Sequence, residues 1–209
     1  MNLSKENSNF LKLVGVISMA LDHVGKYFYP QYSIFQILGR IAFPIFAFQL
    51  TVGYQKTSNK KRYIKRLLIF GIVSQPIYYL LTKNWTLNIL FTLALGFWAL
   101  WAWENKKYFY FYLIIPLSFF VEYQWYGVLM ILGFFVLSEA KYQVPYFALN
   151  SLLYIYLIAR NWLQIYSLLS LVFIYKINFL RIKLPKYFFY VFYPGHMLII
   201  YLIKNFLCG

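Results

Sequence analysis

The feature that most constrains this chain is a succession of long apolar stretches separated by short polar segments. A transmembrane helix needs about 20 mainly apolar residues, or about 17 at the short end. Nine stretches come close to that length, which predicts an all-α, polytopic transmembrane helix bundle of about nine spans, within a range of about eight to ten. The stretches are residues 10–28, 33–54, 63–82, 87–103, 107–123, 125–140, 144–159, 161–177 and 187–206.

Composition and loop length agree with this class. Apolar residues make up 62% of the chain and charged residues 12%, against about 25% charged residues in soluble domains. The connecting segments are too short to fold by themselves, so residues 1–209 are predicted to form a single integral-membrane domain. The junctions at 123–125 and 159–161 are the shortest, and each fits either a tight hairpin or one re-entrant segment.

The net charge of +15 is informative through its distribution. Nucleic-acid-binding proteins present basic residues on a folded, water-exposed face; no such domain is predicted, so nucleic acid is not an expected partner. The basic residues lie between apolar stretches, and residues 56–66 hold six of them. Because positively charged loops stay in the cytoplasm, this loop and the N-terminus are predicted to be cytoplasmic. The expected location is the inner or plasma membrane, with a multi-pass topology and an external C-terminus.

Cysteine and histidine are scarce. The chain has one cysteine, Cys208, and two histidines. This content excludes an internal disulfide framework and does not supply the ligands of a structural zinc site. No metal is expected.

The ionisable residues within the predicted spans or at their ends include Asp22, His23, Arg40, Glu122 and His196. A charged residue at mid-bilayer costs roughly 2.5–3.5 kcal/mol on insertion scales, so it persists when it is paired, hydrated or functional. Asp22 and Arg40 lie at similar depth on adjacent antiparallel stretches, which predicts an ion pair. His23 points about 100° away from Asp22 around the helix and suits proton transfer near neutral pH. The alternative is that the ion pair only joins two helices and that His23 is a satisfied polar side chain.

Prolines and amides mark further positions. Four predicted spans contain a proline away from their ends, where it removes a backbone hydrogen bond and kinks a helix. These are Pro44, Pro76, Pro116 and Pro194. Four interrupted helices would favour an internal cavity, although purely structural bundles also contain kinks. Asn88 and Thr92 share one helix face and are predicted to form interhelical hydrogen bonds.

Two motifs carry a family resemblance. The first is Met-x-x-Asp-His-x-Gly over residues 19–25, and the second is Gly-Arg-x-x-Phe-Pro-x-Phe over residues 39–46. Segments 74–76, 88–93 and 190–196 follow in the same order as in the family. The sequence closely resembles the TraX family, named for the F-plasmid protein that N-acetylates pilin, and the most specific part of the resemblance is residues 12–76.

The resemblance implies a membrane-embedded acyltransferase, related to the wider transmembrane acyltransferase group. Such an enzyme takes acetyl from cytosolic acetyl-CoA and delivers it to an acceptor at or across the membrane. The resemblance implies His23 as the catalytic base, Asp22 as its partner and Arg40 as a supporting residue. Acyl transfer needs a base for the nucleophile and stabilisation of the oxyanion, which His23 and Arg40 could supply.

The acceptor is expected to be an amine or hydroxyl group of a peptide, a pilin-like protein or a glycan. Candidates for contacting it or for lining its cavity are Glu122, His196, Asn88 and Gln75. The chain departs from the family at two positions: Val52 stands where an acidic residue is expected, and Glu122 where aspartate is usual. Pilin as the acceptor therefore does not follow from the resemblance.

The phosphate groups of acetyl-CoA would need cations on the cytoplasmic face. The expected ligands are Lys60, Lys61, Arg62 and Arg66, and the alternatives are Lys176, Arg181, Lys183 and Lys186. The competing interpretation is that these residues only set the topology.

Two other functions remain open. The first is a small transporter or flippase, in which the intramembrane Asp, Arg and His would bind substrate or relay protons. The second is a non-enzymatic membrane partner, such as an immunity or assembly protein. Binding of acetyl-CoA separates both from an acyltransferase.

Overall fold

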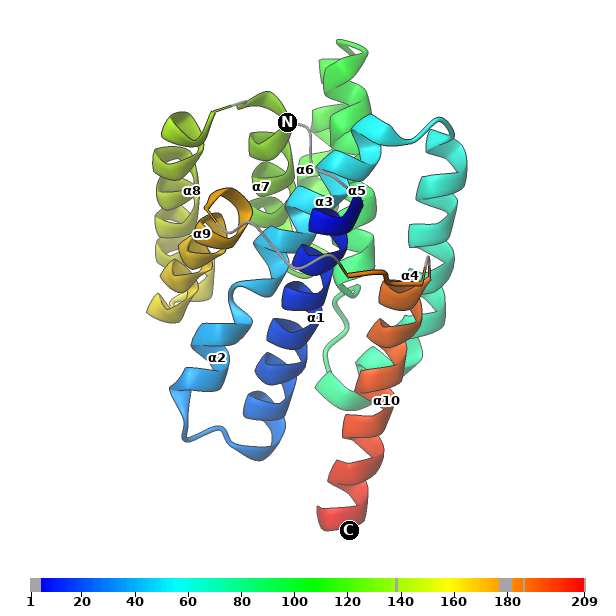
Figure 1. The fold of residues 1–209 in the computed structure, drawn as a ribbon, viewed down its shortest axis with the longest axis vertical. Helices are drawn as coiled ribbons and strands as arrows, with labels where there is room; N and C mark the ends of the chain where they lie inside the picture. Colours follow the sequence, from blue (N-terminus) through cyan, green and yellow to red (C-terminus); the bar gives the residue numbers. More distant parts are fainter. Residues whose placement is uncertain (1–4, 138, 177–181, 186, 209) are drawn as a thin grey trace. The chain divides into compact units, whose positions relative to one another are not determined.

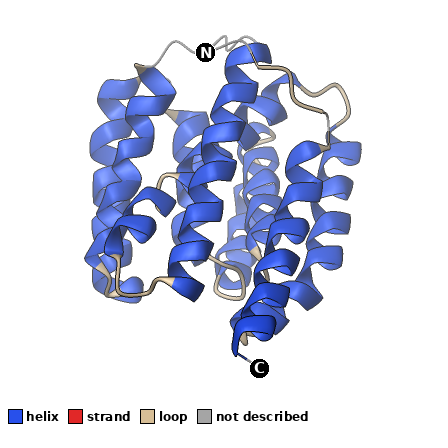
Figure 2. Ribbon diagram, turned by 60° about the horizontal axis from the view of Figure 1, so that its bottom comes forward, coloured by secondary structure: helices blue, strands red, loops and turns tan. Residues whose placement is uncertain are grey.

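Helices form the regular structure of this chain (Figures 1 and 2). The computed structural model describes residues 5–137, 139–176, 182–185 and 187–208. Over these residues no strand forms, and one isolated bridge pairs Leu87 with Val121. The predicted all-α class is therefore confirmed.

The described helices follow the predicted stretches, with several subdivisions. Stretch 33–54 forms two helices, stretch 107–123 begins as a 3-10 helix, stretch 144–159 ends in a π-helix, and stretch 161–177 begins as a 3-10 helix. The elements are α1 (Lys5–Phe28), α2 (Ser33–Gly39), α3 (Ala42–Lys56), α4 (Lys60–Thr82), α5 (Ile89–Glu104), η1 (Tyr108–Tyr110), α6 (Phe111–Ser118), α7 (Gln124–Val136), α8 (Ala140–Tyr154), η2 (Ile155–Ala159), η3 (Trp162–Leu169), α9 (Ser170–Tyr175) and α10 (Phe188–Cys208).

Among the described residues, two helices are long and apolar enough to cross a bilayer by length and composition. They are Ser33–Lys56, which joins α2 and α3 across their short break, and Lys60–Thr82, which is α4. The shorter apolar helices are Ile89–Glu104, Tyr108–Ser118, Gln124–Val136 and Trp162–Tyr175. Two such helices do not establish nine spans, so the span count and the cytoplasmic N-terminus stay predictions.

Large apolar side chains are exposed along α4 and α10. Ile72 is 64% and Val73 is 60% exposed on α4, and Val191 is 61% and Ile199 is 58% exposed on α10. Soluble monomers limit such surface to small patches, whereas a lipid-facing helix carries it along its length. These faces fit a lipid environment.

The prolines interrupt the helices less than the sequence predicted. Pro76, Pro116 and Pro194 lie inside α4, α6 and α10, and each helix continues through its proline. The prediction of a break was wrong at these positions because a proline removes one hydrogen bond without necessarily ending the helix. Stretch 33–54 does break, but at Arg40, which leaves Pro44 in the first turn of α3. Proline is tolerated there because the first N–H groups of a helix have no partner within it.

Residue contacts sort the chain into two compact units. Unit 1 comprises Met1–Phe46 and Ser151–Gly209, and unit 2 comprises Ala47–Asn150. In unit 1, α1 packs against α2 and α10, and η3 packs against α2 and α9. Helices α1 and α10 run in the same direction (Figure 1). The single domain predicted for residues 1–209 stays a prediction.

Helix α5 is the centre of unit 2. It packs against α4, α6 and α7, and Leu90, Ala99 and Leu100 are fully buried. Its sequence is apolar on every side, as in helices that lie inside a bundle. A Cβ atom added at Gly96 would overlap Ile131 of α7, so this glycine permits the close approach of the two helices.

Candidate functional site

The two glycines of the family motifs set the crossing of α1 and α2. A Cβ atom at Gly25 would overlap the Phe35 side chain, and one at Gly39 would overlap the Asp22 side chain. Neither glycine has a positive φ, so the requirement is for space and not for an unusual backbone conformation. The close crossing brings Asp22 of α1 beside Arg40, the residue after α2.

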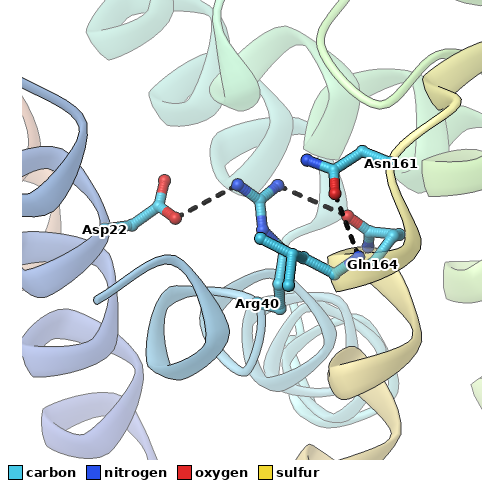
Figure 3. A network of polar contacts seen from close by, with 5 residues as sticks. Asp22, Arg40, Asn161 and Gln164 are labelled. Carbon is cyan, nitrogen blue, oxygen red and sulfur yellow. Dashed lines mark hydrogen bonds and ion pairs between the residues drawn. The ribbon is translucent and has the colours of Figure 1, made fainter. Parts of the chain in front are cut away.

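The Arg40 guanidinium lies between two partners (Figure 3). Nη2 donates a hydrogen bond to Asp22 Oδ1 at 3.2 Å, and Nη1 donates to Gln164 Oε1 at 3.4 Å. The Arg40 and Asp22 side chains are 21% and 19% exposed, so water screens their attraction less than on an open surface. The predicted ion pair is confirmed. We call Asp22, Arg40 and Gln164 the arginine cluster.

Gln164 was missed by sequence reasoning. It lies in η3, which Asn161 caps by accepting a hydrogen bond from Leu163 N at 3.0 Å. Gln164, Ser167 and Ser170 recur every third residue and are all buried, because side chains three apart align along a 3-10 helix. This three-residue spacing of polar residues in an apolar stretch is the signal that could have identified Gln164.

The two histidines of the chain meet in unit 1. His23 Nδ1 lies 2.8 Å from His196 Nε2, and His196 Nδ1 lies 2.8 Å from the backbone oxygen of Phe192. His196 is 7% exposed, and its ring lies parallel to the Phe192 ring, with a 9° interplanar angle and centroids 4.8 Å apart. We call His23 and His196 the histidine pair. The sequence alone predicts a separate role for each histidine, because nothing in the local pattern connects residues 173 positions apart.

The contact within the histidine pair is a hydrogen bond between ring edges. The two rings are inclined by only 17°, with centroids 5.0 Å apart. With 2.8 Å between the facing nitrogens, the rings meet edge to edge and close to one plane, which is the geometry in which a ring N–H reaches a ring nitrogen lone pair.

Helix α1 presents both groups from consecutive residues. Asp22 and His23 diverge by about 100° around the helix axis, so Asp22 faces Arg40 while His23 faces α10. Within the described residues, no group of three or more His, Cys, Asp or Glu side chains is arranged to hold a metal ion. The geometry suits proton transfer at the histidine pair, which shares α1 with the ion-pair partner of Arg40.

Gln75 and Asn88 form an amide network in unit 2. Asn88 accepts from Leu90 N at 3.1 Å and so caps α5, while its Nδ2 donates at 2.8 Å both to Gly71 O and to Gln75 Oε1. Gln75 Nε2 donates to Thr86 O at 3.0 Å. The predicted interhelical hydrogen bonding of Asn88 is confirmed, and its role toward an acceptor stays a prediction.

Glu122 lies in the turn between α6 and α7, so the predicted helix over 107–123 was wrong beyond Ser118. The helix ends there because the next residues pair with another segment: Leu87 N donates to Phe120 O at 2.8 Å, and Glu122 N donates to Leu87 O at 2.9 Å. Thr92 Oγ1 donates to Glu122 O at 2.6 Å. Glu122 belongs to unit 2, and its role toward an acceptor stays a prediction.

An open hollow of about 320 Å³ lies beside Pro76 in unit 2. Its lining residues are Ile72, Gln75, Pro76, Tyr79, Trp85 and Phe91. Gln75 lines this hollow, and its amide is already bonded to Asn88 and Thr86, so its role toward an acceptor stays a prediction. The hollow contains neither member of the histidine pair.

Lys60 begins α4 and has partners in unit 2. Its Nζ forms an ion pair with the Glu104 carboxylate and lies 4.1 Å from the centre of the Tyr54 ring. The Tyr54 hydroxyl donates a hydrogen bond to the same carboxylate at 2.5 Å. Glu104 follows the predicted span 87–103, and the hydrogen bond from Lys60, followed by that from Tyr54, lowers the pKa of Glu104 below its ordinary value.

The other predicted phosphate ligands differ in accessibility. Lys61 and Arg62 are exposed in the first turn of α4, after the Asn59 cap. The Arg66 guanidinium lies 5.5 Å from the centre of the Tyr63 ring. Among the alternative ligands, Lys176 and Lys183 are exposed, and Arg181 and Lys186 lie outside the described residues.

Comparison with known proteins extends the resemblance. The family profile described as TraX protein matches residues 7–204. An uncharacterized protein of Rickettsia prowazekii (strain Madrid E) is 34% identical over 116 residues, which cover 54% of this chain and 45% of the relative. A protein of Dichelobacter nodosus named "Probable fimbrial assembly protein FimC, serogroup H1" is 32% identical over 111 residues, which cover 43% of each chain. No solved structure matches.

The two relatives are matched over less than half of their own lengths. The family profile, in contrast, covers nearly the whole chain, including the histidine pair and the arginine cluster. With the apolar helices described above, it indicates a membrane protein. This chain belongs to the TraX family.

Proposed function

We propose that this chain is a membrane-embedded acyltransferase that moves acetyl from cytosolic acetyl-CoA to an amine or hydroxyl acceptor at or across the membrane. The observation that carries the proposal is the histidine pair, which presents a proton-transfer group on the same helix as Asp22 of the arginine cluster. Family membership adds support. Such an enzyme would lie in the inner or plasma membrane as a multi-pass protein.

In the proposed reaction His23 is the general base. It takes the proton of the acceptor amine or hydroxyl as that atom bonds to the carbonyl carbon of the thioester. The carbon–sulfur bond then breaks, and the departing thiolate of CoA takes the proton from His23. A base in this role typically contributes about 10²–10⁴-fold to the rate.

Arg40 is proposed to stabilise the oxyanion that develops on the acetyl oxygen. A guanidinium stays protonated at all working pH values, and Asp22 and Gln164 hold this one in place. A fixed donor directed at a developing oxyanion is worth about 10²–10³-fold in rate. Asp22 then supports the reaction by orienting Arg40.

The donor and acceptor contacts are proposed from the sequence. Lys60, Lys61, Arg62 and Arg66 would supply charge to the phosphate groups of acetyl-CoA, with the exposed Lys61 and Arg62 the more accessible pair. Glu122, His196, Asn88 and Gln75 are the candidates on the acceptor side. The name of the Dichelobacter relative refers to fimbrial assembly, which favours a peptide or pilin-like acceptor over a glycan.

The test is isotopic. Membranes containing the chain are supplied with acetyl-CoA carrying a ¹³C-acetyl group, and peptides, glycans and lipids are searched by mass spectrometry for labelled acetyl. The proposal expects a labelled acceptor with the wild-type chain and with Ile17→Ala, an exposed position on the same helix. His23→Ala membranes should lack it.

The rival functions give different results in this experiment. Binding of acetyl-CoA by the purified protein without any labelled acceptor would contradict the proposed transfer. Absence of acetyl-CoA binding would favour a transporter or a non-enzymatic membrane partner. Label on an acceptor that persists in His23→Ala would retain the activity and reassign the base, with Glu122 the next candidate.

A further inference from the structure

The hydrogen bond within the histidine pair has a direction, which the next contact determines. A backbone carbonyl oxygen only accepts hydrogen bonds, so His196 Nδ1, 2.8 Å from Phe192 O, carries a proton. A neutral imidazole protonated on Nδ1 has a bare Nε2. His196 Nε2 is therefore the acceptor in its 2.8 Å contact with His23 Nδ1, and His23 Nδ1 is the donor.

The surroundings of the pair favour two neutral rings. His196 is buried, and an additional positive charge in a buried setting is costly unless it is paired. The charged side chains near the pair include two cations, Lys26 of α1 and Lys204 of α10. Their Nζ atoms lie 5.4 and 5.1 Å from the centre of the Tyr27 ring, and the Tyr27 ring centre lies 6.5 Å from that of His23. Arg40, after α2, is matched by Asp22. With both rings neutral, His23 Nε2 is left bare.

We propose that His196 is a positioning residue that fixes His23 in the tautomer with a proton on Nδ1 and a basic Nε2. The inference rests on the proposed function and gives His196 a role other than contacting the acceptor. The bond that one ring nitrogen makes sets which nitrogen of a histidine is protonated. Here that bond is anchored in the backbone of α10, because Phe192 and His196 lie one turn apart.

The proton steps balance around this pair. The acceptor proton moves to His23 Nε2 while the acceptor atom bonds to the carbonyl carbon, and His23 becomes an imidazolium whose Nδ1–H still donates to His196 Nε2. When the carbon–sulfur bond breaks, the thiolate takes the proton from His23 Nε2. His23 returns to its starting tautomer, and His196 keeps its own proton throughout.

The chain contains only two histidines, which makes the tautomer directly measurable. With the ¹⁵N-histidine-labelled protein in lipid nanodiscs, nitrogen NMR reports the protonation of each nitrogen of the two rings. Substitution of one histidine then assigns the signals of both rings. The wild-type protein at neutral pH should show a protonated Nδ1 and a bare Nε2 on each ring. In His196→Leu, His23 loses its acceptor and should shift toward a protonated Nε2. In His196→Gln, the side-chain oxygen can accept the same bond, so the wild-type tautomer should be retained.

Gly195→Ala is the matched control, because nothing besides the chain neighbours and the nearby backbone of α10 lies within 4 Å of a Cβ atom built there. It should leave both ring signals unchanged. Kinetically, His196→Leu should lower kcat by about 10–100-fold, by analogy with the loss of a hydrogen-bond partner that orients a metal-bound histidine. The KM for acetyl-CoA should change little, and His196→Gln should recover most of the loss in kcat.

A proton on Nε2 of His23 in the wild-type protein, or an unchanged His23 signal in His196→Leu, would overturn the inference. If His196→Leu does not fold, the wild-type spectrum decides alone. The two proposals fail separately. A wild-type protein with the expected tautomers but no acetyl transfer refutes the proposed function. Acetyl transfer by a protein whose His23 carries its proton on Nε2 refutes only the positioning role.

Discussion

Replacing Gly39 by alanine should destabilise the protein and separate Asp22 from Arg40. A Cβ atom at this position would overlap Cβ, Cγ and Oδ1 of Asp22. Because the Asp22 Cβ is attached to the α1 backbone, rotation of the side chain cannot remove the overlap. Helix α1 has to move away from α2, which lengthens the 3.2 Å contact between Asp22 Oδ1 and Arg40 Nη2.

The magnitude follows from two opposing effects. Added volume in a packed crossing costs about 1–3 kcal/mol. The higher helix propensity of alanine stabilises a helix interior by up to about 1 kcal/mol relative to glycine. The gain is smaller at Gly39, the last residue of α2. The expected net loss is therefore about 1–2 kcal/mol, before any loss from the weakened ion pair.

Gly195→Ala serves as the control because it makes the same substitution inside α10 with open space around the new atom. The assay is the apparent melting temperature of both variants in the same lipid and detergent. Gly39→Ala should melt below the wild-type protein, and Gly195→Ala at or above it. Equal shifts for the two substitutions would refute the reasoning, because the close approach of Asp22 to Gly39 would then have no energetic consequence.

Three further predictions concern charge. Asp22→Asn and Arg40→Gln should each lower the yield of folded protein, and the double variant should recover part of the loss, because an unpaired charge in a partly buried site costs more than a removed pair; strictly additive losses would show that the two do not interact. The pKa of Glu104 is lowered in the folded protein. The carboxylate therefore contributes to the free energy of unfolding above its unfolded-state pKa, and this contribution is lost as pH falls through its folded-state pKa. Stability measured against pH should therefore drop less on acidification in Glu104→Gln, by roughly 0.2–1 kcal/mol for an exposed pair, and identical acid profiles would contradict this. In a chain that also carries Cys208→Ser, the introduced cysteine of Lys61→Cys should escape an impermeant thiol reagent in intact cells, and its labelling would show that the loop is external.

The helical class and the arginine cluster were accessible from the sequence to different degrees. In lipid, the backbone of a long apolar run can satisfy its hydrogen bonds within the run only as a helix. The sequence therefore predicts the all-α class. The pairing of Asp22 with Arg40 also followed, because opposite charges at similar depth on adjacent antiparallel stretches have few other partners. Gln164 did not follow, since its contact depends on η3 being a 3-10 helix, which hydropathy does not distinguish from an α-helix.

The histidine pair shows a second limit. His23 and His196 are 173 residues apart, and only the packing of α1 against α10 brings them together. Local patterns carry no information on such contacts. The Pro-Gly sequence before His196 was misleading as well, because α10 continues through Pro194 and retains the one-turn contact between His196 and Phe192 that a broken helix would lose.

The rate of acetyl transfer by purified His23→Ala, relative to the wild-type protein and to Ile17→Ala, tests the central claim most directly. Removal of a general base should lower the rate by about 10²–10⁴-fold, while folded yield and acetyl-CoA binding stay near wild-type levels. Ile17→Ala, at a 51% exposed position on the same helix, should transfer acetyl at close to the wild-type rate. A well-folded His23→Ala protein that transfers acetyl at the wild-type rate would contradict the account.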